Sequence, residues 1–271
     1  ARTDLVAWLD VFGTRFIVFV DTAEEFDWAA PLARDAHSVS AVAAIPDAHR
    51  WFADHGVPLT YMVDYPIVAD PRAVEALGAA CADGVSAIGT QLHGWVNPPF
   101  QEALTPFNSY VGNLPRSLEA AKIDRLTDAI TAAFGTRPIA YRAGRYGIGP
   151  QTLTLLAERG YRLDSSMRAR YSYAADGGPD FSDIGNAAFH AGPGGSLVEL
   201  PLTTVYTGLL RRHGTTVYRA LGRLPKGRGL AARMRLLSRV ALTPEDMPLP
   251  DALEAIAVAA GEGVRVLNFS F

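Results

Sequence analysis

Short apolar runs alternate with amphipathic stretches along most of the chain. The apolar runs predict strands at about 15–21, 57–63, 85–92, 138–142, 161–164, 197–201 and 264–270. Helical periodicity predicts helices at about 40–55, 71–82, 115–134, 149–160 and 245–261, the last capped by Thr243 with Pro244 behind it. Strands and helices that alternate about seven times are typical of a mostly parallel sheet, open or closed into a barrel. We therefore expect one α/β domain over residues 1–271.

The first predicted strand leads directly into a dense group of acids. From Phe16 the sequence reads Phe-Ile-Val-Phe-Val-Asp21-Thr-Ala-Glu24-Glu25-Phe-Asp27-Trp28. A continuous apolar run is typical of a strand buried on both faces, and α/β folds place their chemistry at the carboxyl ends of such strands. Four acids in seven residues therefore favour a functional site over a solvated turn, with Asp21 as the first candidate.

Polar side chains also stand at the ends of three later strands: His93 after the third, Arg142, Arg145 and Tyr146 after the fourth, and Asp164 after the fifth. A histidine in this position is a candidate metal ligand or proton carrier. An arginine at the end of a buried strand requires a carboxylate partner, and Asp21 is the candidate. Asp164 has two possible roles, to orient one of these arginines or to cap its own turn.

The order of these motifs resembles the polysaccharide deacetylase superfamily with its NodB-type domain. The motifs are Asp21 after the first strand, His93 in a polar third strand, Arg-Ala-Gly-Arg-Tyr-Gly at 142–147 and Asp-Ser-Ser at 164–166. Gly-Pro-Asp-Phe at 178–181 resembles one bacterial branch of it. The resemblance covers about 15–271 and implies a distorted (β/α) barrel of about seven mostly parallel strands. It also implies metal-assisted hydrolysis of N-acetyl groups on a sugar or polysaccharide.

The resemblance implies catalytic roles for three residues. Asp21 matches the family's catalytic base, Arg142 matches the arginine that holds the base, and Asp164 matches the acid of the fourth motif. The family also has a catalytic histidine after its last strand. That position would follow Phe271, so we expect this chain to be incomplete at its C-terminal end.

The family's metal ligands fall on other residue types here. Its second acid corresponds to Thr22 or Ala23, and its His-x-x-x-His pair to Gln91 and Trp95. A divalent metal, with zinc as the expected ion, would then be held by His93, Glu24 and Glu25. The candidates for contact with the sugar are Trp28, Trp95, Arg145 and Tyr146.

Charge is unevenly distributed along the chain. The stretch from Leu200 to Pro244 has nine Arg or Lys residues and no acid, whereas the whole chain has a formal charge of −3, which leaves −12 for the remainder. We expect a basic insert at about 205–243 that is either attracted to an anionic surface or simply a solvated helical face. The isoelectric point near 6.1 argues against nucleic acid as the main partner.

Cysteine content and hydropathy limit the expected cellular location of the protein. One cysteine excludes an intramolecular disulfide. No apolar run approaches the roughly 20 residues of a transmembrane segment, and the N-terminal residues contain no apolar signal-peptide region. We therefore expect a cytoplasmic or membrane-peripheral protein.

Three functions compete at this stage. The first is deacetylation of a sugar or glycan. The second is glycan binding without catalysis, which Ala23, Gln91 and Trp95 favour because they cannot replace the family's ligands. The third is glycoside hydrolysis, which would pair Asp21 with Glu25 or Asp27 at about 5–10 Å.

Overall fold

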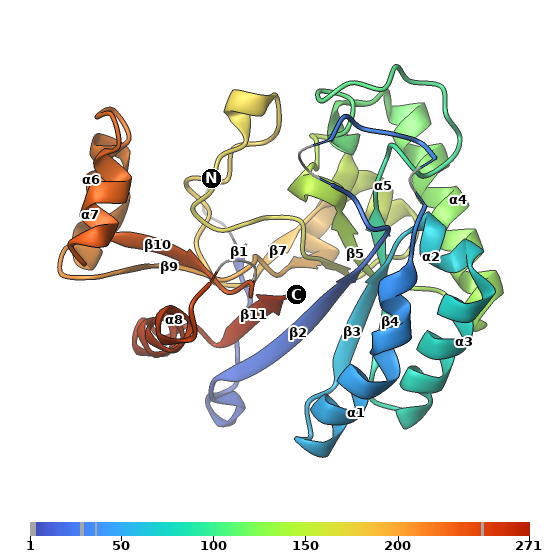
Figure 1. Cartoon of the computed structure of the whole chain (residues 1–271), viewed down its shortest axis with the longest axis horizontal. Coiled ribbons are helices and arrows are strands. Elements are labelled where there is room, and N and C mark those ends of the chain that lie inside the picture. Colours follow the sequence, from blue (N-terminus) through green and yellow to red (C-terminus); the bar gives the residue numbers. More distant parts are fainter. Residues whose placement is uncertain (1–3, 28–29, 36, 245–246) are drawn as a thin grey trace.

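The computed structural model describes residues 4–27, 30–35, 37–244 and 247–271. Its main sheet has nine strands in the order β1-β7-β8-β6-β5-β4-β3-β2-β11 (Figure 1). Their bounds are β1 (Asp4–Leu5), β2 (Arg15–Thr22), β3 (Leu59–Val63), β4 (Ala87–Leu92), β5 (Ala140–Ala143), β6 (Leu163–Asp164), β7 (Phe189–Ala191), β8 (Leu197–Glu199) and β11 (Val266–Ser270). The seven strands from β11 to β8 run parallel, whereas β7 and β1 add an antiparallel edge.

These seven parallel strands are the seven predicted from the apolar runs. Their cores are buried because each strand packs against the sheet on two sides and against helices on a third; Val18 and Met62, for example, are 0% exposed. The sheet curls into an incomplete barrel with α1 to α5 along its outer side (Figure 1). The predicted α/β class and distorted barrel are confirmed.

All five predicted helices are present: α1 (Ile45–Asp54), α3 (Pro71–Ala80), α4 (Arg116–Phe134), α5 (Thr152–Glu158) and α8 (Leu249–Gly261). Three others were not predicted: α2 (Tyr65–Ala69), α6 (Gly214–Leu221) and α7 (Gly227–Arg233). The prediction that Thr243 caps α8 is wrong. Pro248 holds an extended backbone, and the helix can begin only after it.

The barrel remains open between β8 and β11, and side chains bridge the gap. Asn268 Nδ2 donates to Leu200 O over 2.8 Å and to Ser165 Oγ over 2.9 Å. The backbone N–H of Ser270 donates to Leu242 O over 2.9 Å. These bonds fix the position of β11 next to β2, where its last residues reach the candidate site.

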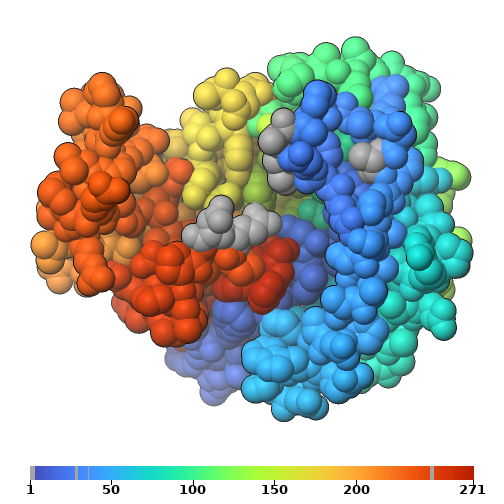
Figure 2. All heavy atoms as spheres, viewed as in Figure 1, coloured from blue at the N-terminus to red at the C-terminus, as the bar shows by residue number. Residues whose placement is uncertain are grey.

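A separate antiparallel pair, β9 (Thr204–Thr207) and β10 (Ser238–Ala241), carries α6 and α7 away from the barrel. We call residues 204–241 the arm; it corresponds to the predicted basic insert at about 205–243. Figures 1 and 2 show the arm, coloured orange, standing out from the body of the molecule. No helix in the described ranges has both the length and the apolar character to cross a membrane.

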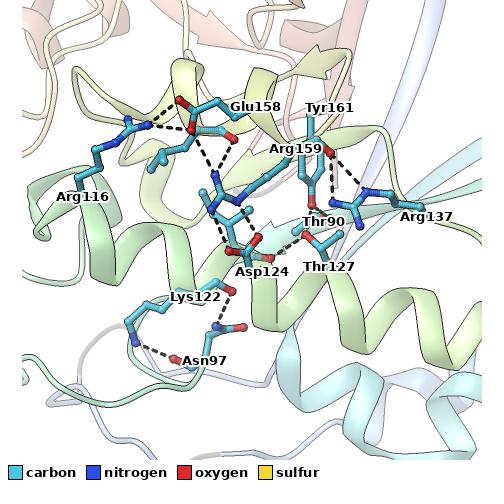
Figure 3. A network of polar contacts seen from close by, with 12 residues as sticks. Thr90, Asn97, Arg116, Lys122, Asp124, Thr127, Arg137, Glu158, Arg159 and Tyr161 are labelled. Atoms are coloured by element: carbon cyan, nitrogen blue, oxygen red, sulfur yellow. Dashed lines mark hydrogen bonds and ion pairs between the residues drawn. The ribbon is translucent and has the colours of Figure 1, made fainter.

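Buried polar contacts secure the segment after β4, which carries His93. Lys122 of α4 is 0% exposed, and its Nζ donates to Gly94 O over 2.9 Å and to Asn97 O over 2.6 Å (Figure 3). The Tyr161 hydroxyl lies 2.9 Å from Thr90 Oγ1 of β4. The helix layer thus holds both β4 and the turn that follows it.

Candidate active site

Asp21 and Arg142 form an ion pair at the carboxyl ends of β2 and β5. Arg142 Nη1 donates to Asp21 Oδ1 over 2.7 Å, and Ser270 Oγ donates to Asp21 Oδ2 over 3.1 Å. The guanidinium also donates to Ser165, from Nε to the backbone oxygen over 3.2 Å and from Nη2 to Oγ over 3.0 Å. The guanidinium side chain is 1% exposed and the carboxylate 26%. A buried cation therefore holds a carboxylate that solvent can reach.

This pair opens into a cleft of about 380 Å³. The described residues that line it include Asp21 near the end of β2 and Glu24 after it, Gln91 and His93 at the end of β4, Arg142, Arg145 and Tyr146 at the end of β5, and Tyr110 and Tyr173 beside Arg145 and Tyr146. The predicted convergence of Asp21, His93 and Arg142 on one mouth of the barrel is therefore observed. Parallel strands deliver these side chains to the same edge because their carboxyl ends coincide.

Glu24, Asp64 and His93 form a buried cluster beside the pair. His93 Nδ1 lies 2.6 Å from Glu24 Oε2 and 3.8 Å from Asp64 Oδ2. The backbone N–H of Glu24 donates to Asp64 Oδ2 over 3.0 Å, and Trp95 Nε1 donates to Glu24 Oε1 over 2.8 Å. One donor atom from each of the three residues lies within 4.8 Å of the others.

The pKa values of the two carboxyls in this cluster are shifted in opposite directions. Burial opposes the ionisation of Glu24, but the charge of His93 and hydrogen bonds from His93, Asp64 and Trp95 lower its pKa to about 2. Burial raises the pKa of Asp64 well above its usual range, and the neighbouring Glu24 carboxylate raises it further. A second negative charge at Asp64 is therefore disfavoured, and a cation beside it would oppose this effect.

This donor set fits a divalent cation. Two carboxylates and one imidazole are ligand types that zinc accepts, and three protein ligands are usual where a metal acts in catalysis. A second buried carboxylate is costly without a positive partner, which a divalent ion would supply. Glu24, Asp64 and His93 are therefore the residues that would hold such an ion.

The other predicted ligand and sugar contacts lie in different places. Glu25 is exposed, outside the cluster, and accepts hydrogen bonds from Ser38 Oγ and Ser40 Oγ, each over 2.6 Å. Trp95, expected to contact the sugar, is 1% exposed and stacks on His93 with ring centroids 4.5 Å apart. Trp95 therefore packs against the cluster and does not line the cleft. Trp28 lies outside the described residues.

Arg145 and Tyr146 lie on the cleft wall in a strained turn. Their φ angles are 56° and 58°, a conformation that costs about 1–3 kcal/mol per residue for side chains other than glycine. Arg145 donates to Ser109 Oγ over 2.5 Å and to the Tyr110 hydroxyl over 3.0 Å. The Tyr146 ring stacks on Tyr173 with centroids 5.8 Å apart. Their role in sugar binding remains a prediction.

Asp164 is buried and does not line the cleft. Its Oδ1 accepts from Ser166 Oγ over 2.5 Å, and it pairs in register with Glu199 of β8. Burial raises the pKa of Asp164, and burial together with the charge of Asp164 raises the pKa of Glu199 well above its usual range. Burial therefore disfavours the ionised form of both carboxyls. Of the two roles expected, the local turn is the one seen, since Ser165 holds Arg142.

Sequence reasoning missed Asp64, although a signal for it exists. Asp64 directly follows the second predicted strand, as Asp21 follows the first, and precedes Tyr-Pro. In the structure its Oδ1 accepts from the backbone N–H of Ile67 over 3.0 Å, so it caps α2 while Oδ2 faces the cluster. Gln91, also unassigned, lines the cleft with a buried Oε1 that no described residue donates to.

Comparisons with protein-family models and with curated proteins found no match. Among solved structures, the chain is similar to a protein from Mycobacterium smegmatis designated a polysaccharide deacetylase, with 19% identity and a TM-score of 0.53 over 100% of this chain and 81% of the other. A protein from Pseudomonas aeruginosa PAO1 with the same designation is 16% identical, with a TM-score of 0.49 over 96% of this chain and 77% of the other. The first likeness shows that the chain has the polysaccharide deacetylase fold.

Proposed function

We propose that this chain, which has the polysaccharide deacetylase fold, is a hydrolase that removes N-acetyl groups from a sugar or polysaccharide. The observation that carries the proposal is the arrangement of the cleft. The solvent-accessible Asp21, held by buried Arg142, and the cluster of Glu24 and His93 line the same cavity. Amide hydrolysis needs both a base and a group that polarises the carbonyl, and this cleft has a candidate for each.

In this proposal Asp21 is the general base that accepts the proton of the attacking water. Arg142 and Ser270 hold its two carboxylate oxygens, so the base is oriented before substrate binds. A divalent ion at Glu24, Asp64 and His93, when bound, would supply positive charge to polarise the acetyl carbonyl. Backbone N–H groups of the strained turn at Tyr146 are our candidates for stabilising the oxyanion.

The test is release of acetate from an N-acetylglucosamine oligomer in the presence of divalent metals. The Asp21→Asn variant should lose about 10²–10⁴-fold in rate, because it removes the base but keeps the volume. Asp128→Asn, on the exposed face of α4, is the matched control and should match wild type. Full activity of Asp21→Asn would eliminate the base assignment.

Two other functions are less well supported by this geometry. Glycan binding without catalysis was favoured by the apparent loss of metal ligands, but Asp64 supplies a third donor. Glycoside hydrolysis would need Glu25 or Asp27 opposite Asp21, and Glu25 is instead bound to serines outside the cleft. Wild-type protein that binds glycans but releases no acetate with any divalent metal would place the binding function first.

We also propose that the arm attaches the protein to an anionic membrane surface, which would make its location membrane-peripheral. The arm exposes large apolar side chains next to its arginines: Leu209 (79%), Leu224 (59%), Leu230 (57%) and Met234 (52%). Exposed leucines within a strongly basic helical segment are typical of elements that lie in the headgroup region of anionic lipids. The barrel itself carries the compensating negative charge and would face away.

A further inference from the structure

A second cavity, of about 420 Å³, lies between the arm and the loop after β6. The described residues that define its chemistry are Arg168 and Tyr171 from the loop, Tyr218, Arg228 and Arg239 from the arm, and Asp251 from α8. Among the residues that the structure describes, three arginines and one acid give a net positive lining. It does not contain Asp21 or the Glu24–Asp64–His93 cluster.

Arginine and tyrosine side chains alternate through this cavity. The guanidinium carbons of Arg168 and Arg239 lie 3.7 Å and 3.4 Å from the centroid of the Tyr171 ring. Arg239 also lies 4.7 Å from the Tyr218 ring, and Arg228 lies 4.3 Å from the same ring. The rings hold the planar guanidinium groups in place, so less side-chain entropy is lost when a ligand binds them.

The three guanidinium groups lack negative partners within the described part of the chain. None of them forms an ion pair there, and Asp251 is not bonded to any of them. Arg239 Nη1 donates to Arg170 O over 2.8 Å, and Arg228 Nε donates to Tyr218 O over 3.1 Å. The Nε atoms of Arg168 and Arg239 are buried, and no described residue offers them an acceptor. Such a group of cations is stabilised when an anion enters.

Arg168 joins this cavity to the catalytic cleft. It lines both cavities, and its guanidinium carbon lies 5.7 Å from the ring of Tyr146 in the cleft wall. The two cavities are therefore neighbours that share the side chain of Arg168. This adjacency is what allows one elongated ligand to be considered for both cavities.

We infer that the second cavity is a subsite for an anionic group of the substrate. This inference rests on the proposed deacetylase function and narrows its substrate class to N-acetylated glycans that carry a carboxylate or a phosphate. Arginine forks bind both groups through paired hydrogen bonds, and charge-assisted bonds of this kind discriminate strongly against neutral analogues.

The test measures binding by calorimetry at constant low ionic strength with three ligands. They are a neutral N-acetylglucosamine tetramer, the same tetramer with a terminal phosphate, and a tetramer that alternates glucuronate with N-acetylglucosamine; inorganic phosphate alone is a fourth probe. We expect at least one anionic tetramer to bind about tenfold or more tightly than the neutral one. The preferred anion identifies the source of the charge.

Arg239→Gln and Arg228→Gln should each lower the affinity for that anionic tetramer about tenfold and leave the neutral one unchanged. Arg228 is exposed, so its replacement serves if the partly buried Arg239 variant does not fold. Arg233→Gln, on the same helix but outside the cavity, is the matched control. Equal affinity for neutral and anionic tetramers, or equal losses in Arg233→Gln and Arg228→Gln, would overturn the inference.

This design separates the subsite from the proposed function, because binding requires no turnover. Charge-selective binding that depends on Arg228 and Arg239, without acetate release, would support the anionic subsite and contradict the proposed deacetylase activity. Acetate release with no preference for an anionic glycan would retain the deacetylase and reject the subsite.

Discussion

Each buried carboxyl near the cleft takes its protonation state from the side chains around it. Glu24 contacts His93 and stays ionised, with a pKa of about 2, whereas Asp64, buried beside that charge, has a raised pKa. The pKa of Asp164 is likewise raised by burial. Among the described carboxyls that line the cleft, Asp21 is the one that combines an ion pair to a buried arginine with access to solvent. These differences support Asp21 as the proposed base and Glu24 and Asp64 as the proposed metal ligands.

Replacement of Asp64 by Asn should weaken the binding of a divalent ion by tenfold or more, because one of three ligands loses its charge. Equilibrium dialysis with zinc against wild type measures this effect. Asp128→Asn is again the control, since Asp128 is exposed on α4 and remote from the cluster. Undiminished zinc binding in Asp64→Asn would exclude Asp64 as a ligand.

At the scale of elements, close packing between the segments after β4 and β5 places His93. Gly144 lies at the end of β5, and a Cβ atom there would clash with the His93 ring and come within 2.8 Å of Leu92 O. Only glycine therefore permits the imidazole to reach Glu24.

Gly144→Ala should displace the His93 ring and lower divalent metal affinity by about 10-fold or more. Gly78→Ala, in α3, is the control, since nothing lies within 4 Å of its added methyl group. We expect that variant to bind metal normally and to be slightly more stable, because alanine favours helix. Equal metal affinity in both variants would show that His93 does not depend on this contact.

The β6–β8 pair buries the carboxyls of Asp164 and Glu199 at partner positions of the two strands. Both pKa values are raised in the folded state, so their contribution to stability is complete below the unfolded values, 4.5 for Glu199, and is lost as pH rises through the folded values. The free energy of unfolding should therefore fall as pH rises above about 4.5.

Glu199→Gln should flatten this pH dependence, because it removes one of the two carboxyls whose pKa is raised on folding. Urea unfolding at a series of pH values would measure the slope. Glu158→Gln is the control, since Glu158 is about half exposed and pairs with Arg116 on the surface. A variant slope identical to wild type would mean that Glu199 does not contribute to the pH dependence.

At the scale of the whole molecule, the arm concentrates positive charge on one side of an acidic barrel. Its link to the body includes the ion pair of Arg219 with Asp183, over 2.6 Å. The arm also exposes Arg211, Arg212, Arg223, Arg233 and Arg235, together with Leu209, Leu224 and Leu230. The orientation toward an anionic surface that we propose rests on this polarity.

The arm should bind phosphatidylserine-containing vesicles in sedimentation assays, more weakly as salt rises, because exposed charges are screened within about 8–10 Å near physiological ionic strength. Reversal of Arg211, Arg212 and Arg223 to Glu should lower binding by 100-fold or more, at about 1 kcal/mol per removed charge.

Reversal of three exposed barrel arginines, Arg50, Arg72 and Arg125, is the matched control and should have a much smaller effect. Vesicle binding that is insensitive to salt, or equal in both triple variants, would contradict membrane attachment through the arm. The arm would then be a solvated basic surface.

The sequence allowed the barrel and part of the site to be predicted. Apolar runs gave all seven parallel strands, and acids or bases at their ends gave Asp21, His93 and Arg142. The arm's strands escaped prediction because Thr204–Thr207 and Ser238–Ala241 have polar residues at half of their positions and form no apolar run. Asp64 was not assigned and Trp95 was given a different role, because their positions depend on how the loop after β2 folds back toward β3 and β4, which no local pattern records.

Ser270 donates to Asp21 across 249 positions of sequence. On the ribosome, β2 emerges early and β11 last, so translation at about 5–20 residues per second separates them by roughly 12–50 s. During that interval the outer edge of β2, with its run of aromatic and branched side chains, lacks its final neighbour. The base and its arginine can acquire their third partner only after Ser270 has been made, and until then the edge of β2 stays open to pairing with other strands.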